Sequence, residues 1–131
     1  MNSGSSNLRR SDGQAAVEFA IILPILVLLV LGIGQFGVAF HNYLAITDAA
    51  RVGARAAAVK RTSSPCTAAT TAIQNTVSTT QWGEISGRIT CTAGANVGDP
   101  VTITIKYPYE IGLPGVSASG DLTANAQERM E

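Results

Sequence analysis

Histidine, cysteine and net charge are all scarce in this 131-residue chain. Nine basic residues balance nine acidic ones, so the composition lacks the basic excess that marks a nucleic-acid-binding protein. The single histidine, His41, and the two cysteines are too few and too far apart in sequence to form a usual zinc ligand set. The composition therefore predicts a protein that binds no nucleic acid, no metal and no other cofactor.

Catalytic motifs are missing as well. The sequence contains neither a phosphate-binding loop nor a dinucleotide-binding glycine pattern. The stretch GVSASG at 115–120 is similar to a nucleophile elbow, but Ser119 stands where that motif requires glycine. His41 has no acid and no nucleophile near it in sequence. We therefore expect that the protein is not an enzyme.

Apolar residues, in contrast, are concentrated in one run. From Phe19 to Phe40 there are 22 residues without a single charged side chain, and we call this segment the apolar run. As a helix it is roughly 33 Å long, which is enough to cross the hydrocarbon core of a bilayer. Pro24, three glycines and Gln35 interrupt it, and membrane helices tolerate proline and glycine more than soluble helices do. The run predicts one transmembrane helix, and the alternative is a buried helix of a soluble protein.

The flanking charges predict the orientation of this helix. Arg9 and Arg10 precede the apolar run, whereas the first charged residue after it is Asp48. Because basic residues stay on the cytoplasmic side, we expect a single-pass protein of the inner (cytoplasmic) membrane, with a cytoplasmic N-terminus and an exported C-terminal domain. The alternative is a secretory signal cut after Ala39, but the apolar part of such a signal is only about 7–15 residues long.

The chain divides into three expected segments. Residues 1–13 form a polar cytoplasmic leader, residues 14–60 a transmembrane helix that continues beyond the membrane, and residues 61–131 an exported α+β domain. The outer half of the long helix carries a stripe of small residues at every fourth position: Ala45, Ala49, Gly53 and Ala57. Such a stripe lets another helix approach closely, although an alanine-rich helix can also simply reflect helix propensity.

The exported segment shows first a helical and then a strand pattern. Residues 66–82 have apolar side chains at helical spacing and predict a second helix that ends at Gly83. Alternation of apolar and polar residues predicts strands at 85–92, 101–107 and 121–130, and the segment 107–120 reads as a long loop. The expected fold is α+β: a long N-terminal transmembrane helix that continues into a small domain with a second helix and a short antiparallel sheet.

Both cysteines, Cys66 and Cys91, lie in the segment that we expect to be exported. In an oxidising compartment they can form a disulfide between the second helix and the first strand. Closing this loop would contribute about 3–4 kcal/mol to stability in the chain-entropy model. The alternative is two thiols that pack as small hydrophobic side chains.

The stretch GQAAVEFAIILP, residues 13–24, resembles the start of a type IV pilin-like precursor. In that family a short basic leader ends in glycine, a prepilin peptidase cuts after this glycine, and the fifth residue of the mature protein is glutamate. The resemblance implies cleavage between Gly13 and Gln14. The residues that it implies for assembly of the helix with other subunits are Glu18, Phe19 and Pro24.

A longer match is more specific. Together with AITDAARVGARAA at 45–57, the chain is similar over residues 13–58 to the TadE-like proteins of the tight-adherence, or Flp pilus, machinery. Gln14 stands where an aromatic residue usually begins a mature major pilin, which favours a TadE-like minor pilin, or pseudopilin.

This resemblance implies a structural membrane protein that takes part in assembling a pilus for surface adhesion, either from the membrane or as part of the filament. It implies two kinds of protein partner: the prepilin peptidase, and other pilin-like subunits that pack against the N-terminal helix. Within such a bundle Glu18 would pair with the terminal ammonium of a neighbour and set the register of the helices. The alternative for Glu18 is a carboxylate that simply lies at the level of the lipid headgroups. The alternative is a single-pass envelope protein whose exported domain binds a ligand or partner unrelated to pili.

Overall fold

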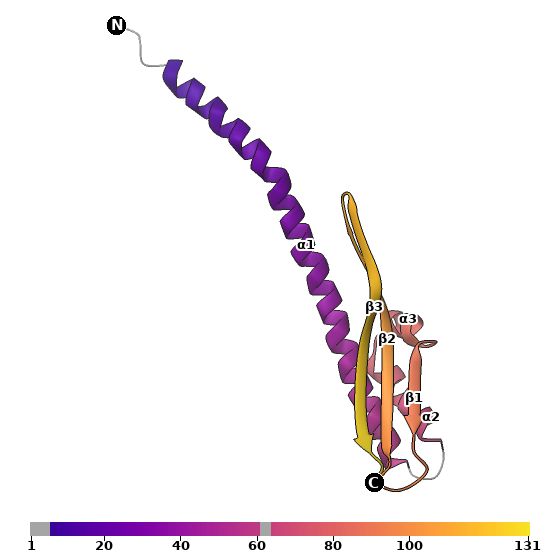
Figure 1. Ribbon diagram of the computed structural model, residues 1–131. Helices are drawn as coiled ribbons and strands as arrows, with labels where there is room; N and C mark the ends of the chain where they lie inside the picture. Colours follow the sequence, from indigo (N-terminus) through magenta and orange to yellow (C-terminus); the bar gives the residue numbers. More distant parts are fainter. Residues whose placement is uncertain (1–5, 61–63) are drawn as a thin grey trace.

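The computed structural model describes residues 6–60 and 64–131, and it describes side chains from Gly13 onward. Along this part of the chain the elements are α1 (Ser6–Val59), α2 (Pro65–Thr76), α3 (Thr79–Ile85), β1 (Ile89–Ala93), β2 (Pro100–Leu113) and β3 (Val116–Arg129) (Figure 1). The expected α+β class is confirmed. Residues 1–5 of the expected leader and residues 61–63 after the long helix lie outside the described residues.

The helix α1 is continuous over 54 residues and ends at Val59, as expected. It begins at Ser6, however, rather than at residue 14. The segment between these positions contains no proline, and its glycine, Gly13, lowers helix propensity by only about 1 kcal/mol, so nothing in it stops the helix. Pro24 also lies inside α1 without ending it, and Figure 1 shows the helix as one gently curved rod.

The three strands form an antiparallel sheet in which β2 is central. The alternation expected for residues 101–107 is confirmed, because Val101, Ile103 and Ile105 are fully buried whereas Lys106 is exposed. The third expected strand is confirmed as the second half of β3. One face of the sheet therefore contributes to the core, and the opposite face is polar.

The single helix expected over residues 66–82 is wrong, because this segment forms two short helices. α2 ends before Val77, whose backbone is extended, and α3 begins after Ser78. The Ser78 side chain accepts a hydrogen bond from the Gln81 backbone N–H, and the Gln81 side chain accepts one from the Ser78 backbone N–H. This capping box starts a new helix. Gly83, expected as the end of the helix, lies within α3.

The first strand is shorter than expected. The expectation was a strand from 85 to 92, but Ile85 is the last residue of α3 and β1 begins at Ile89. Ile85 is nevertheless fully buried, so its apolar side chain belongs to the core while its backbone belongs to a helix. Between these two elements the chain makes a turn in which the Arg88 N–H donates to the Ile85 carbonyl.

The loop expected over residues 107–120 is wrong as well. β2 continues to Leu113, and its pairing with β3 extends to the Leu113–Val116 pair. The residues between them form the turn, in which Gly115 has a φ of 86°, a conformation that glycine adopts without steric cost. The β2–β3 hairpin therefore extends well beyond β1 as a two-stranded arm. This arm extends from the sheet in the same general direction as the N-terminal half of α1 (Figure 1).

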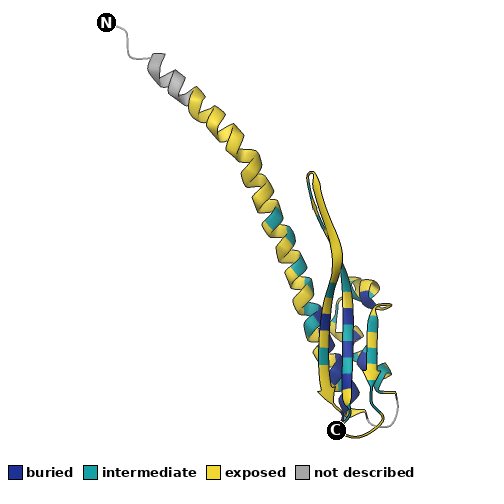
Figure 2. Cartoon of the chain, in the orientation of Figure 1, coloured by how far each residue is buried: buried dark blue, intermediate teal, exposed yellow. Residues whose placement is uncertain are grey.

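The core lies between the apolar face of the sheet and the second half of α1 together with α2 (Figure 2). The contribution of α1 consists mostly of alanines, and its fully buried residues are Ile46, Ala49, Ala50, Ala54 and Ala57. A Cβ atom placed on Gly53 would lie only 2.7 Å from Cδ1 of Ile73 on α2. The stripe of small residues thus allows α2 of the same chain to pack closely against α1.

The expected disulfide is present between Cys66, in the first turn of α2, and Cys91 on β1. The two Cα atoms are 5.7 Å apart, within the usual range for a disulfide. The bond closes a loop between residues 25 positions apart and ties α2 to the edge strand of the sheet. We call residues 46–59 of α1, which contribute to the core, together with residues 64–131 the folded domain, and the part of α1 before residue 46 the first half of α1.

Candidate functional site

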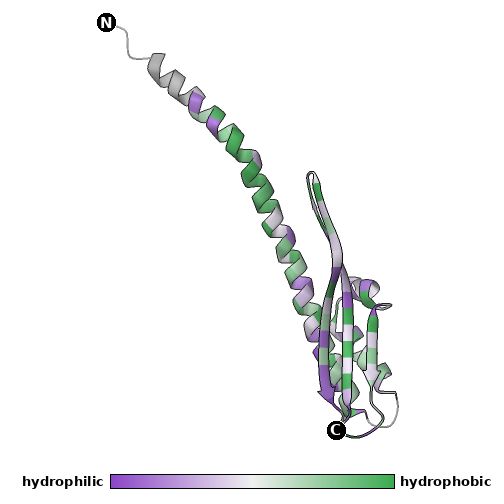
Figure 3. Ribbon diagram, viewed as in Figure 1, coloured by the Kyte–Doolittle hydropathy of each residue, from purple (hydrophilic) through white to green (hydrophobic). Residues whose placement is uncertain are grey.

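The first half of α1 projects away from the folded domain, and most of its residues are apolar and exposed (Figures 2 and 3). Phe19, Ile25 and Phe40 are 62%, 65% and 63% exposed. This part of α1 is long and apolar enough to cross a membrane, and none of the most apolar stretch is buried within the chain. A continuous apolar surface of this extent indicates contact with lipid or with another protein chain.

The residues that the sequence singled out for processing lie at the start of this exposed segment. Gly13 and Gln14 are both exposed and helical. Among the side chains that the structure describes, from residue 13 onward, none lies within 4 Å of a Cβ atom placed on Gly13. Glu18 is also exposed, and its Oε1 accepts a hydrogen bond of 3.2 Å from the side-chain amide of Gln14. The carboxylate therefore lies one helical turn from the residue that cleavage would make the new N-terminus.

Phe19 and Pro24 complete the set of expected assembly residues, and both lie on the exposed part of α1. Pro24 has no backbone N–H, so the carbonyl of Ala20 lacks its partner in the helical hydrogen-bond pattern. The structure brings Gln14 and Glu18 into contact, whereas Phe19 and Pro24 face the surroundings of the helix. None of the five residues belongs to the core of the folded domain.

Sequence reasoning noted Gln35 as an interruption of the apolar run but assigned no partner to its side chain. Its Nε2 donates a hydrogen bond of 2.5 Å to the Gly112 carbonyl, and its Oε1 accepts one of 2.9 Å from the Gly112 N–H. β1 pairs with β2 only as far as Ile105, so this part of the β2 edge is free of a neighbouring strand. Gln35 is the only residue between Phe19 and Phe40 with a hydrogen-bonding side chain, which is the signal that could have identified it.

A second contact joins α1 to the folded domain nearby. The side chain of Gln81 on α3 donates a hydrogen bond of 3.2 Å to Oδ1 of Asn42. Together with the Gln35 contact, it holds α1 against the folded domain at two levels along the helix. The position of the apolar run relative to the sheet is therefore fixed by polar contacts as well as by core packing.

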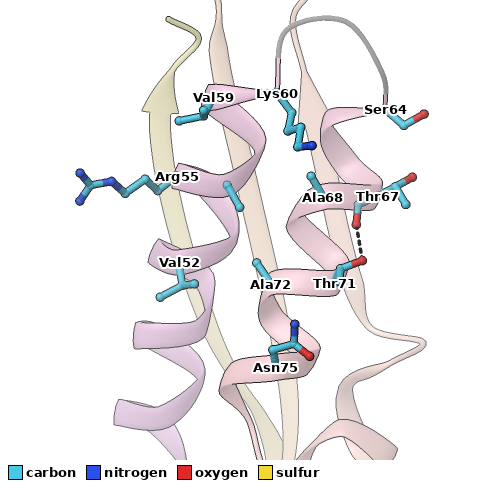
Figure 4. Close-up of a pocket in the computed structure, with 11 residues that line it drawn as sticks. Val52, Arg55, Val59, Lys60, Ser64, Thr67, Ala68, Thr71, Ala72 and Asn75 are labelled. Atoms are coloured by element: carbon cyan, nitrogen blue, oxygen red, sulfur yellow. Dashed lines mark hydrogen bonds between the residues drawn. The ribbon is translucent and has the colours of Figure 1, made fainter.

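An open groove of about 860 Å³ lies between α1 and α2 at the far end of the folded domain (Figure 4). Its walls are formed by small and apolar side chains such as Val52, Ala68 and Ala72, and the Arg55 side chain points away from α2. Within residues 13–60 and 64–131, no three His, Cys, Asp or Glu side chains lie close enough together to hold a metal ion. The groove thus offers a mainly apolar surface, and polar side chains of Lys60, Thr71 and Asn75 also line it.

Comparison with known proteins agrees with the family resemblance of the sequence. Residues 13–55 match the family of TadE-like proteins. No curated protein and no solved structure matches the chain. The matched segment includes the exposed half of α1 and most of the half that packs into the folded domain, and it ends before α2. TadE-like proteins are associated with assembly of the Tad pilus and are generally non-enzymatic pilus components. Residues 13–55 of this chain are a TadE-like family domain.

Proposed function

We propose that this protein is a minor pilin, or pseudopilin, that takes part in assembling a tight-adherence (Flp-type) pilus for surface adhesion. The observation that carries the proposal is the exposed apolar half of α1, which begins with Gly13, Gln14 and Glu18 inside the TadE-like segment. Such a helix requires a bilayer before assembly and other apolar helices afterwards. In this proposal the helix lies first in the inner membrane and later among the helices of other pilin-like subunits.

The topology follows from the same proposal. Residues 1–13 are a cytoplasmic leader that a prepilin peptidase removes, α1 crosses the membrane once, and residues 61–131 are exported. Two observations support export of the folded domain. It contains the Cys66–Cys91 disulfide, which persists in oxidising compartments, and Arg9 and Arg10 lie at the opposite end of the apolar run.

Glu18 has a specific role in this proposal. Cleavage after Gly13 leaves an ammonium group on Gln14, one helical turn before Glu18. When the mature helix leaves lipid for a bundle of similar helices, the carboxylate meets the ammonium of a neighbour. A buried pair of this kind adds little net stability, but it penalises every register in which one charge stays unpaired. Glu18 therefore determines how the helices align along their axes rather than whether the helix enters the membrane.

Replacing Glu18 tests this role. We expect Glu18→Ala to insert into the membrane, to be cut after Gly13 and to form its disulfide, because none of these steps needs the carboxylate. Assembly should fail, because a buried ammonium without its partner costs about 3–5 kcal/mol. The measurements are co-purification with other pilin-like subunits and the number of pili per cell. Glu84→Ala, which removes an exposed carboxylate on α3, is the matched control and should assemble normally. Normal assembly of Glu18→Ala would contradict the proposed role.

The alternative function is that of a single-pass envelope protein whose exported domain binds a ligand or partner unrelated to pili. The groove between α1 and α2 favours it, since α2 lies beyond the TadE-like segment and the groove has apolar walls. The two functions differ in the processing that they require. A pilin-like subunit must be cut at Gly13, whereas an envelope anchor can keep its leader.

A further inference from the structure

We propose that the tip of the β2–β3 hairpin is a second membrane contact, which rests against the outer leaflet beside α1. The hairpin tip is defined as residues 111–118. This inference depends on the membrane insertion of α1 proposed above. It adds that the folded domain also contacts the bilayer directly, and that this contact sets how far α1 enters the membrane.

The position of the tip along α1 is fixed by the two hydrogen bonds between Gln35 and Gly112. These bonds place Gly112 at the same height along α1 as Gln35, which lies inside the apolar run. The strands continue past Gly112 toward the turn, and at about 3.3 Å per residue the turn lies roughly 7 Å farther along. Consistent with this reach, residues Val30 and Leu31 of α1 line the same groove as Tyr109 of β2. The hairpin tip therefore lies beside the part of α1 that the proposal places at the membrane.

The composition of the tip fits this position. From Ile111 to Gly120 the sequence IGLPGVSASG contains no charged side chain, and Val116 at the turn is 66% exposed. The nearest charges flank the segment on both sides. Glu110 is exposed, and Asp121 forms a salt bridge of 3.1 Å with Arg88. An uncharged turn with an exposed valine, between charged residues, is the pattern of a surface that meets an apolar or interfacial environment.

The depth of the contact is limited by the backbone. Beyond Ile105 the outer edge of β2 has no neighbouring strand, and Gln35 satisfies only the two backbone groups of Gly112. Unpaired N–H and C=O groups are not tolerated in hydrocarbon, because nothing there can hydrogen-bond to them. The tip must therefore rest at the boundary between headgroups and acyl chains. Because the turn lies about 7 Å beyond Gly112, this boundary lies between Gln35 and about residue 30 of α1. About 20 residues of helix toward the N-terminus then reach about residues 10–15.

Tryptophan fluorescence of the full chain in lipid vesicles tests the contact. All variants carry Trp82→Phe, which removes the only native tryptophan. A single tryptophan is then placed at the tip (Val116→Trp), in the apolar run (Leu26→Trp), or in the turn before β2 (Val97→Trp). Val97 is a matched control, because it is 70% exposed in a turn at the opposite end of the sheet from the hairpin tip. The probes are phosphatidylcholines brominated near the headgroup end of the acyl chains, for the tip, and near their methyl end, for Leu26→Trp. Disulfide formation verifies that each variant is folded.

We expect brominated lipid to lower the emission of Val116→Trp and Leu26→Trp by about twofold and to leave Val97→Trp unchanged, because bromine quenches only the tryptophans that touch lipid. The emission of Val116→Trp should also move to shorter wavelength in vesicles. Quenching of Leu26→Trp without quenching of Val116→Trp would overturn the tip contact and leave the proposed function intact. Failure to quench Leu26→Trp would overturn membrane insertion itself. A blue shift of Val116→Trp that grows with the protein-to-lipid ratio, without quenching, would show that a second copy covers the tip, and would also overturn the proposal.

Discussion

At the scale of single residues, Gly53 shows how a missing side chain determines the packing of α1. It lies opposite Ile73, and an added Cβ atom would come within 2.7 Å of Cδ1 and 2.8 Å of Cγ1 of that residue. Ile73 is fully buried, so its side chain has little room to move away. The close approach of α1 and α2 therefore depends on glycine at this one position.

This dependence predicts the effect of enlarging the residue. Gly53→Leu should lower the free energy of unfolding of the folded domain by about 3 kcal/mol, at the upper end of the cost of overpacking a core. Chemical denaturation of the protein in detergent measures it. The control is Gly83→Leu on α3, where no atom lies within 4 Å of the added Cβ and stability should be equal or slightly higher. Equal stability of the two variants would contradict the packing described for α1 and α2.

Residue patterns singled out the processing stretch, whose role stays a prediction, and assigned no partner to Gln35. Gly13, Gln14 and Glu18 were identified because they lie within a few residues of one another and resemble a known processing motif. The contact of Gln35 was missed because its partner, Gly112, is 77 residues away in sequence, and no local pattern links an amide in an apolar helix to a strand edge. Gln35 has the only hydrogen-bonding side chain in the apolar run. The sequence therefore indicated that this side chain needs a partner, but not which residue the partner is.

At the scale of elements, the disulfide holds together the part of the folded domain with the least core. α2 contributes two fully buried residues, Ala69 and Ile73, and β1 is an edge strand of five residues. Neither element buries enough apolar surface to be stable alone. The Cys66–Cys91 bond fixes one to the other and so reduces the conformational freedom of the unfolded chain between them.

Removing the bond should therefore lower stability without changing the fold. Replacing both cysteines with alanine should cost about 3–4 kcal/mol, the loop-closure entropy of a segment of this length. Thermal unfolding with and without reductant measures the effect, and the double variant should not respond to reductant. In the unmodified protein, no thiol should react with an alkylating reagent before reduction. Rapid alkylation of both cysteines in unreduced protein would contradict the bond.

The elements that sequence patterns predicted best have long, uninterrupted patterns. α1 was found because its apolar run contains no charged residue over 22 positions, and the first half of β2 because apolar and polar residues alternate without a break. The break between α2 and α3 was missed because Val77 continues the helical spacing, although the capping box of Ser78 and Gln81 was present in the sequence. The distal hairpin was missed because Pro108 and Gly112 are unusual in strands. Both are tolerated there because this part of β2 has no neighbouring strand on its outer edge.

At the scale of the whole molecule, the two halves of α1 differ in their surroundings. Its first half is apolar and exposed, whereas its second half is buried under α2 and the sheet through residues such as Ile46 and Ala50. The TadE-like segment at 13–55 covers both halves. The same segment thus supplies the exposed apolar surface, which we propose contacts the membrane and other subunits, and the surface that packs into the folded domain. In that proposal, any movement of the helix along the membrane normal moves the folded domain with it.

Processing of the N-terminus decides whether the exposed half of α1 is a pilin-like helix or a simple membrane anchor. The protein is extracted from membranes of cells with and without a prepilin peptidase, and its intact mass and N-terminal fragments are measured. We expect a chain from Gln14 to Glu131 when the peptidase is present and the full-length chain when it is absent. Gly13→Leu should stay full-length in both cells, whereas Gly34→Leu, a matched change in the apolar run, should be cut normally. A full-length chain in the presence of the peptidase, or a chain that begins at Phe40, would contradict the proposed function.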